Sequence, residues 1–179
     1  MKINILKILT IVFFLLIICT GGKNKMDLLH VSSSAFKHGK EIPPKFTCKG
    51  ANISPEISWH GVPENAKSIV LIADDPDAPM GTWVHWVIYN IPVSVTTLNE
   101  NFPKTAELKD GTKQGISDFG KSGYSGPCPP SGTHRYFFKV YALDIVLSLS
   151  PATATKSTVT KAMERHIIAS GELMGTFKK

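Results

Sequence analysis

The sequence has few charged residues and no run of basic ones. Charged side chains make up 19% of the 179 residues, and the formal net charge is +6. Proteins that bind duplex nucleic acid carry a basic stripe or patch, so nucleic acid is not expected as a partner. Glycine (14) and proline (12) fall short of a low-complexity composition, and the 42% apolar share excludes a disordered chain. No repeat, heptad pattern or linker follows Asp27, so we expect one domain over residues 27–179.

The longest hydrophobic stretch lies at the N-terminus, from Ile8 to Cys19. It is shorter than the roughly 20 residues that cross a bilayer as a helix. Lysines precede it and small residues follow it, so residues 1–22 are expected to be a signal peptide or a lipoprotein leader. In a leader, Cys19 would be the lipidated residue, although Ile18 departs from the small residue usual before it. An uncleaved anchor is the alternative. In each case we expect the domain to be exported (periplasmic, secreted or membrane-anchored) and to meet a membrane only through its N-terminal segment or a lipid anchor.

Cysteine is scarce beyond that segment, where only Cys48 and Cys128 occur. Their spacing matches no zinc-site pattern, which needs close pairs of ligands. In an exported protein the two thiols could form a disulfide, or they could be buried and reduced. The sequence leaves both alternatives open.

The body of the chain is rich in short runs of β-branched and aromatic residues, which favour strands over helices. The longest predicted strands are Ser68–Ala73, Val84–Ile91 and Arg135–Leu143, and shorter ones are Leu28–Ser32, Ile57–Trp59 and Gly175–Phe177.

One segment has the spacing of an amphipathic helix. Ser157 is its expected N-cap and Gly171 its expected end. Its apolar stripe, which places His166 in the core, consists of Val159, Ala162, Met163, His166 and Ile167. These elements predict a mainly β fold, with an antiparallel sheet and a helix packed on it.

Three polar clusters stand at strand ends, and proline or glycine braces each of them. They are DPDAP (Asp75–Pro79), WVHW (Trp83–Trp86) and a stretch from Gly123 to Tyr136 that contains GPCPPSGTHRY. The third cluster includes the end of a glycine-rich segment, residues 104–133, that shows almost no periodicity. A loop of this length in a compact domain is usually functional or disordered, and we expect a binding loop.

These motifs, in this order, resemble the phosphatidylethanolamine-binding protein family, in its bacterial Raf-kinase-inhibitor-like branch. The resemblance extends from about Phe36 to the C-terminal ELMGTF. It implies a central antiparallel sheet with a smaller second sheet and one or two flanking helices. It also implies cis peptide bonds in the DPDAP turn. The C-terminal helix that gates the cavity of mammalian members is expected to be absent.

The resemblance further implies a cavity for a small anion, either phosphate or a phospholipid headgroup. The anion-binding residues that it assigns are Asp75, Asp77, His85, Gly126, Pro127, His134 and Tyr136. Protonated histidines can donate charge-assisted hydrogen bonds to phosphate oxygens, whereas ionised carboxylates repel them. We therefore expect one carboxylate to orient a histidine and the other to pair with Arg135, as support behind the ligand.

The function expected from the resemblance is non-catalytic anion binding, with a regulatory or inhibitory role toward a protease or a kinase. A homodimer is left open, and no cofactor is expected. No G-x-S-x-G nucleophile motif is present. The alternative function is a metal-dependent hydrolase, in which Zn²⁺ or Mn²⁺ would be held by Asp75, Asp77, His85 and His134.

Overall fold

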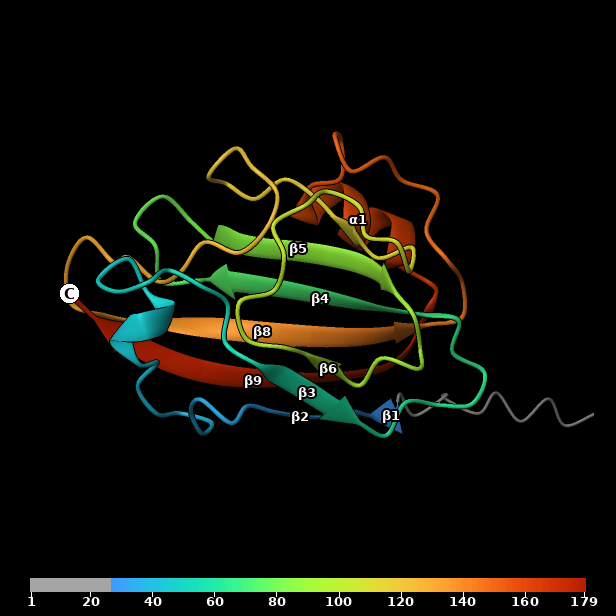
Figure 1. Cartoon of the computed structure of the whole chain (residues 1–179), viewed down its shortest axis with the longest axis horizontal. Coiled ribbons are helices and arrows are strands. Elements are labelled where there is room, and N and C mark those ends of the chain that lie inside the picture. Colours follow the sequence, from blue (N-terminus) through green and yellow to red (C-terminus); the bar gives the residue numbers. More distant parts are fainter. Residues whose placement is uncertain (1–26) are drawn as a thin grey trace, which may run out of the picture.

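A computed structural model describes residues 27–179 of the chain (Figure 1). The leader expected over residues 1–22, and with it Cys19, lies outside the described residues. The elements are β1 (Asp27–Leu28), β2 (His30–Ser32), the 3₁₀ helix η1 (Pro44–Phe46), β3 (Ile57–His60), β4 (Ser68–Asp75), β5 (Trp83–Ile91), β6 (Thr97–Leu98), β7 (Lys113–Gln114), β8 (Thr133–Leu143), α1 (Lys156–Met163) and β9 (Ile167–Lys178). From Asp27 onward, no helix is long and apolar enough to cross a membrane.

The strands form two sheets, as expected from the sequence. The central sheet has the order β1-β9-β8-β4-β5-β7, and the smaller sheet has the order β2-β3-β6. Neighbouring strands run antiparallel except β1, which pairs with β9 in the parallel sense. In Figure 1, β4, β5, β8 and β9 run side by side across the molecule, with α1 at one side of them.

Two hydrophobic clusters cover the two faces of the central sheet. One cluster lies between the central sheet and the smaller sheet and includes Leu71, Trp86 and Phe138. The other contains Val70 and Val87 together with Val159 and Met163 of α1. Because side chains alternate along a strand, β4 supplies residues to both clusters and is buried along its whole length.

The helix is shorter than the apolar stripe predicts. Its N-cap is Thr155 rather than Ser157, since the Thr155 side chain accepts a hydrogen bond from the backbone N–H of Thr158. It ends at Met163, and the residues from Ile167 onward form β9. Gly171 therefore lies inside a strand, where a Cβ would collide with the backbone carbonyl of Leu29.

The prediction that His166 belongs to the core is wrong. Its side chain is 41% exposed, and its Nδ1 lies 2.8 Å from Asp144 Oδ1. The reason is the long pairing of β9 with β8, which extends from Leu143↔Ile167 to Thr133↔Lys178. Sheet hydrogen bonds along this ladder override the helical spacing of the segment.

The prediction of cis peptide bonds in the DPDAP turn is also wrong, because every peptide bond from Asp27 to Lys179 is trans. The turn is closed by hydrogen bonds instead. Asp75 Oδ1 accepts from the backbone N–H of Asp77 (2.8 Å), and the backbone N–H of Gly81 donates to the Ala78 carbonyl (3.1 Å).

Candidate functional site

A cavity of about 330 Å³ lies where the end of β4 meets the starts of β5 and β8. Its polar lining is small and comes from one residue on each of these strands: Asp75, His85 and Tyr136. The remaining lining residues are Ala78, Pro79, Met80, Trp83, Phe119, Cys128 and Pro130. The cavity therefore has a few buried polar groups inside a largely apolar rim.

A β-bulge in β5 turns His85 toward this cavity. In the pairing with β4, Ala73 lies opposite Trp86 and Asp74 lies opposite Val84, so His85 is one extra residue. As a result, Trp86 and His85 point to the same face of the central sheet as Tyr136. The ring centroids of His85 and Tyr136 are 5.2 Å apart. Val84, on the other side of the bulge, packs in the cluster under α1.

His85 is held as a neutral ring in a buried position. Its Nδ1 lies 2.7 Å from the backbone carbonyl oxygen of Ser125, which can only accept, so the Nδ1–H donates. Burial lowers the pKa of His85, and hydrogen bonding to Ser125 and the charge of Asp75 oppose this only in part. Phe119 covers the ring from a second side, at 5.3 Å between centroids. In this tautomer Nε2 is a hydrogen-bond acceptor.

Asp75 is fixed by two hydrogen bonds. His134 Nδ1 donates to its Oδ2 at 2.7 Å, and the backbone N–H of Asp77 donates to its Oδ1 at 2.8 Å. Asp75 and His134 are both buried. The expectation that a carboxylate orients a histidine is therefore confirmed as a contact, but His134 lies behind Asp75 and is not a lining residue.

Asp77 pairs with Arg135, as expected. The guanidinium donates to both carboxylate oxygens, from Nε at 2.9 Å and from Nη2 at 2.7 Å, and the backbone N–H of Arg135 donates to Oδ2 at 2.9 Å. Hydrogen bonds from Arg135 lower the pKa of Asp77 to about 2. This pair joins the DPDAP turn to the start of β8 beside the cavity, and Asp77 is not a lining residue.

Tyr136 carries a buried hydroxyl that makes no hydrogen bond of standard geometry among residues 27–179, although the Asp75 side chain and the Cys128 backbone amide are close enough to interact with it. The residue is 3% exposed and lines the cavity. Burial, the charge of Asp75 and hydrogen bonding with the Asp75 side chain raise the pKa of Tyr136, so the phenol stays protonated. The backbone amide of Cys128 has a smaller, opposite effect on the same phenol. A buried hydroxyl without a hydrogen bond of standard geometry is costly, which marks it as a place where a ligand atom can bind.

The wall between Ser125 and Pro130 is tied to the loop after η1. The Gly126 N–H donates to Asn52 Oδ1 at 2.7 Å, and the Cys48 N–H donates to the Pro127 carbonyl at 3.0 Å. A disulfide joins Cys48 to Cys128, which settles the alternative that the sequence leaves open. Gly126 and Pro127 are buried and do not line the cavity, so they support the wall rather than contact its contents.

Sequence reasoning misses Met80 and Phe119 of the apolar rim, which lie outside the three polar clusters. Met80 is 96% exposed, and Phe119 and Trp83 are 40% and 37% exposed. Phe119 is held beside His85 because its neighbour Asp118 exchanges two hydrogen bonds with Val84, one through its side chain. The available signal was an aromatic residue, Phe119, within the glycine-rich segment 104–133. That signal does not predict where Phe119 lies relative to β5.

The proposed metal centre does not form. Across the described residues, no group of three or more His, Cys, Asp or Glu side chains is arranged to hold a metal ion. Asp77 and His134, two of the four expected ligands, point their polar atoms at Arg135 and Asp75 instead.

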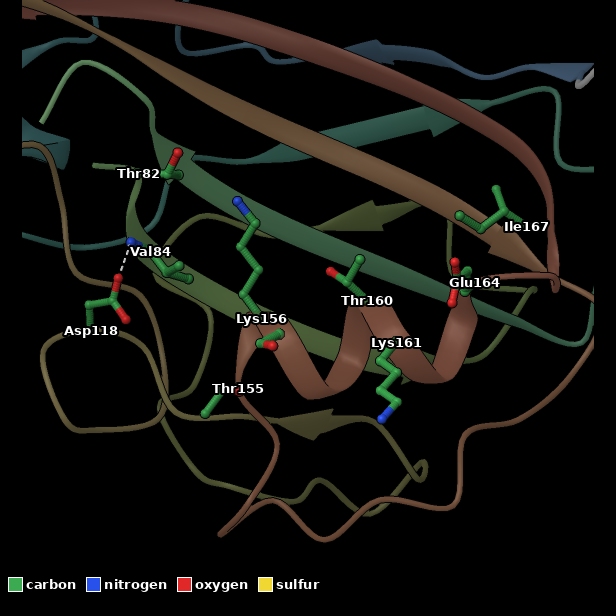
Figure 2. A pocket seen from close by; sticks show the side chains of 10 residues that line it. Thr82, Val84, Asp118, Thr155, Lys156, Thr160, Lys161, Glu164 and Ile167 are labelled. Atoms are coloured by element: carbon green, nitrogen blue, oxygen red, sulfur yellow. Dashed lines mark hydrogen bonds between the residues drawn. The ribbon is translucent and has the colours of Figure 1, made fainter. Parts of the chain in front are cut away.

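A larger groove of about 830 Å³ runs along α1 on the other face of the central sheet (Figure 2). Figure 2 shows Thr160 and Lys161 on the helix and the hydrogen bond from Val84 to Asp118 at one end of the groove. The Lys156 side chain pairs with the buried Asp74. The groove is lined mainly by exposed polar side chains, and none of them is a buried polar group that lacks a partner.

Comparisons with known proteins agree with this architecture. The family model described as "Phosphatidylethanolamine-binding protein" matches residues 32–178. A UPF0098 protein of Methanothermobacter thermautotrophicus is 52% identical over 151 residues, covering 84% of this chain and 99% of the relative. A UPF0098 protein of Aquifex aeolicus is 50% identical over 154 residues, covering 85% and 90%.

Two solved structures are similar to this one. The putative phosphatidylethanolamine-binding protein homolog CT736 of Chlamydia trachomatis has a TM-score of 0.77 and 44% identity, covering 86% of this chain and 99% of that one. YbcL of E. coli, described as a member of the mammalian PEBP family, has a TM-score of 0.75 and 33% identity, covering 84% and 98%.

Proposed function

Because the chain belongs to the phosphatidylethanolamine-binding protein family, we propose that the cavity between β4, β5 and β8 binds a small oxyanion. The observation that carries this proposal is the buried Tyr136 hydroxyl, which lines the cavity and makes no hydrogen bond of standard geometry within residues 27–179. A phenol is a good donor to an oxyanion, and a hydrogen bond to a charged acceptor in a site that excludes water is stronger than a neutral one.

The neighbours of Tyr136 support the same role. Asp75, which lines the cavity, is held by His134, and Asp77 in the adjoining turn is held by Arg135. The disulfide and the Gly126–Asn52 hydrogen bond hold the wall between Ser125 and Pro130. A site that is already rigid spends little conformational entropy when a ligand binds.

We propose binding rather than catalysis. Among the lining residues, Tyr136 carries the only hydroxyl and Cys128 has its sulfur in a disulfide, so neither a serine nor a free thiol is in place as a nucleophile. A regulatory or inhibitory role toward a protein, and a homodimer, stay predictions from the sequence.

We also propose that the domain works outside the cytoplasm. Both Cys48 and Cys128 are exposed, and an accessible disulfide persists in an oxidising compartment. The export signal expected over residues 1–22 would deliver the domain there.

The test is calorimetric titration of the protein with inorganic phosphate. Tyr136→Phe should weaken binding about 10- to 100-fold, because it removes one hydrogen bond to a charged group. Tyr141→Phe is the matched control, since Tyr141 lies on the same strand and borders a different hollow. The proposal fails if phosphate does not bind the wild-type protein, or if both variants bind it equally.

A further inference from the structure

Two histidines lie directly opposite each other on the smaller sheet. β2 and β3 pair antiparallel, and their register places His30 opposite His60 and Val31 opposite Trp59 (Figure 1). Residues directly opposite in an antiparallel pair have their Cβ atoms about 4.5–5.5 Å apart and point to the same face. The two imidazoles therefore project from neighbouring positions on one face of this sheet.

That face is the outer one. Trp59 is fully buried, and Val31 packs against the cluster between the two sheets. Because side chains alternate along a strand, the next residue on each strand points the opposite way. His30 and His60 accordingly face solvent, and both are exposed.

The two rings are free of other contacts. Within residues 27–179, neither His30 nor His60 makes a hydrogen bond, an ion pair or a ring contact. By contrast, three other histidines are held through Nδ1, namely His85, His134 and His166. A neutral imidazole has one nitrogen lone pair, so each of the two exposed rings can offer one to a metal ion.

The backbone on both sides of the pair is already fixed. Before His30, the buried Leu29 donates its N–H to the Ser170 carbonyl of β9 at 2.9 Å. Before His60, the Trp59 N–H donates to the Thr96 carbonyl at 2.9 Å. Only side-chain rotation is needed to bring the two rings together, so little conformational entropy is lost when they bind one ion.

We propose that His30 and His60 together bind one divalent transition-metal ion, Cu²⁺ most tightly, with water in the remaining coordination positions. Neutral imidazole is the commonest metal ligand in proteins, and the affinity of nitrogen sites for divalent ions is highest for Cu²⁺. Ligand nitrogens bound at about 2 Å from an ion lie about 3 Å apart, a separation that rings on facing strand positions can reach.

The surroundings of the pair do not oppose a cation. His30 borders a hollow of about 470 Å³ that Lys139 and Glu172 also line. The Lys139 ammonium is engaged by the buried Asp74, at 2.9 and 3.0 Å from its two carboxylate oxygens. Glu172 is exposed, and its carboxylate attracts a cation.

This ion would have a structural effect. It would join β2, a strand of three residues, to β3 close to where the chain enters through β1. An ion that binds the folded pairing more tightly than the unfolded chain stabilises the fold. The site shares no residue with the anion cavity or with the metal centre that does not form.

The experiment titrates the full-length protein with Cu²⁺, Ni²⁺ and Zn²⁺ by calorimetry. We expect one Cu²⁺ per chain at this site, bound more tightly than Ni²⁺ or Zn²⁺. His30→Gln and His60→Gln should each weaken Cu²⁺ binding about 100-fold, because one ligand is left and the advantage of two linked ligands is lost. For the same reason the double variant should bind little more weakly than either single variant.

His38→Gln is the matched control. His38 is also exposed, but it lies in a turn and not on a paired strand, so this variant should bind Cu²⁺ as the wild type does. Cys19 is retained in every variant, so any ion that it binds is common to all of them and cancels in the comparison.

Two further measurements separate a shared site from two independent histidines. Electron paramagnetic resonance should show two imidazole nitrogens on Cu²⁺ in the wild type and one in each single variant. At a Cu²⁺ concentration of ten times the wild-type Kd, the wild-type Tm should rise by about 3–6 °C. Both single variants should lack this rise, and with a chelator present they should melt at the wild-type temperature.

The inference is overturned if either single variant binds Cu²⁺ as tightly as the wild type. It is also overturned if a single variant loses half of the bound Cu²⁺ at unchanged affinity, which is the behaviour of two independent histidines. Neither result bears on the proposed anion binding, because His30 and His60 do not line that cavity.

Discussion

The backbone carbonyl of Ser125 accepts a hydrogen bond of 2.7 Å from His85, across 40 residues of sequence. This contact fixes the tautomer of a ring that is 4% exposed and lies at the cavity. Because burial is the largest cause of the lowered pKa of His85, the folded protein holds this histidine uncharged.

Stability should therefore depend on pH through His85. Its folded pKa is below the 6.5 of an unperturbed histidine, so the unfolded chain binds the extra proton more readily between these two values. The free energy of unfolding should rise with pH through this window, and the stability contributed by the neutral ring should be lost as pH falls. Urea unfolding at several pH values measures this slope, and ¹⁵N NMR measures the tautomer.

His85→Asn should flatten that part of the pH dependence, because Asn can still donate to Ser125 but does not titrate. His60→Gln, a change at an exposed histidine on β3, is the control and should keep the wild-type slope. A His85 that titrates at or above 6.5, or carries its proton on Nε2, would contradict the account.

Asp77→Asn should weaken phosphate binding several-fold without unfolding the domain. The variant loses the charged pair that holds Arg135 and the start of β8, while Asp75 keeps the N–H bond from residue 77. Because the wild-type pKa of Asp77 is about 2, this pair should contribute its full stability above the ordinary aspartate pKa of 3.8, and that contribution should be lost as pH falls toward 2. Calorimetry and thermal unfolding separate the two effects, and unchanged phosphate affinity would remove the supporting role.

Gly126→Ala should destabilise the protein by about 1–3 kcal/mol, the usual effect of overpacking. A Cβ at this position would lie 2.2 Å from the Phe46 carbonyl oxygen and 2.9 Å from the Asn52 side chain that holds the wall. Ser131→Ala, at an exposed position in the same loop, should have little effect. Denaturant unfolding measures the stability of both variants. If Gly126→Ala were as stable as Ser131→Ala, the wall would be able to shift to accommodate the added Cβ.

Reduction of the Cys48–Cys128 disulfide should destabilise the protein by about 4 kcal/mol, as the loop-entropy estimate gives for a long closed loop. The cysteines are 80 residues apart in sequence, so the bond restricts a large part of the unfolded chain. Guanidinium unfolding with and without dithiothreitol measures the difference. A double Cys→Ser variant should match the reduced protein and should not respond to the reagent.

The strands of the core could be predicted because each is a continuous apolar run. The predicted strand over residues 68–73 differs from β4 by two residues, and residues 84–91 differ from β5 by one. The ends were underestimated because Asp74 and Asp75 read as a turn. In the fold they extend β4, since Asp74 is buried between Lys139 and Lys156 and Asp75 accepts from His134.

The candidate site could be predicted in composition but not in arrangement. Which polar side chain lines the cavity depends on the bulge at His85, and no local pattern encodes that extra residue. The same limit applies to β9. Its segment contains two glycines and two charged residues, and it becomes a strand only because β8 lies beside it along its whole length.

The pairing of β1 with β9 determines how far the cavity lies from the point where the chain enters the central sheet. β1 lies against Ala169 and Ser170, level with Ala142 near the far end of β8, whereas the cavity lies at Tyr136 (Figure 1). Six residues of extended strand separate these levels by about 20 Å. The chain therefore enters the domain at one end of the central sheet, and the cavity lies toward the other end. If the chain were anchored to a surface upstream of β1, the cavity would lie at the end of the sheet farther from the anchor.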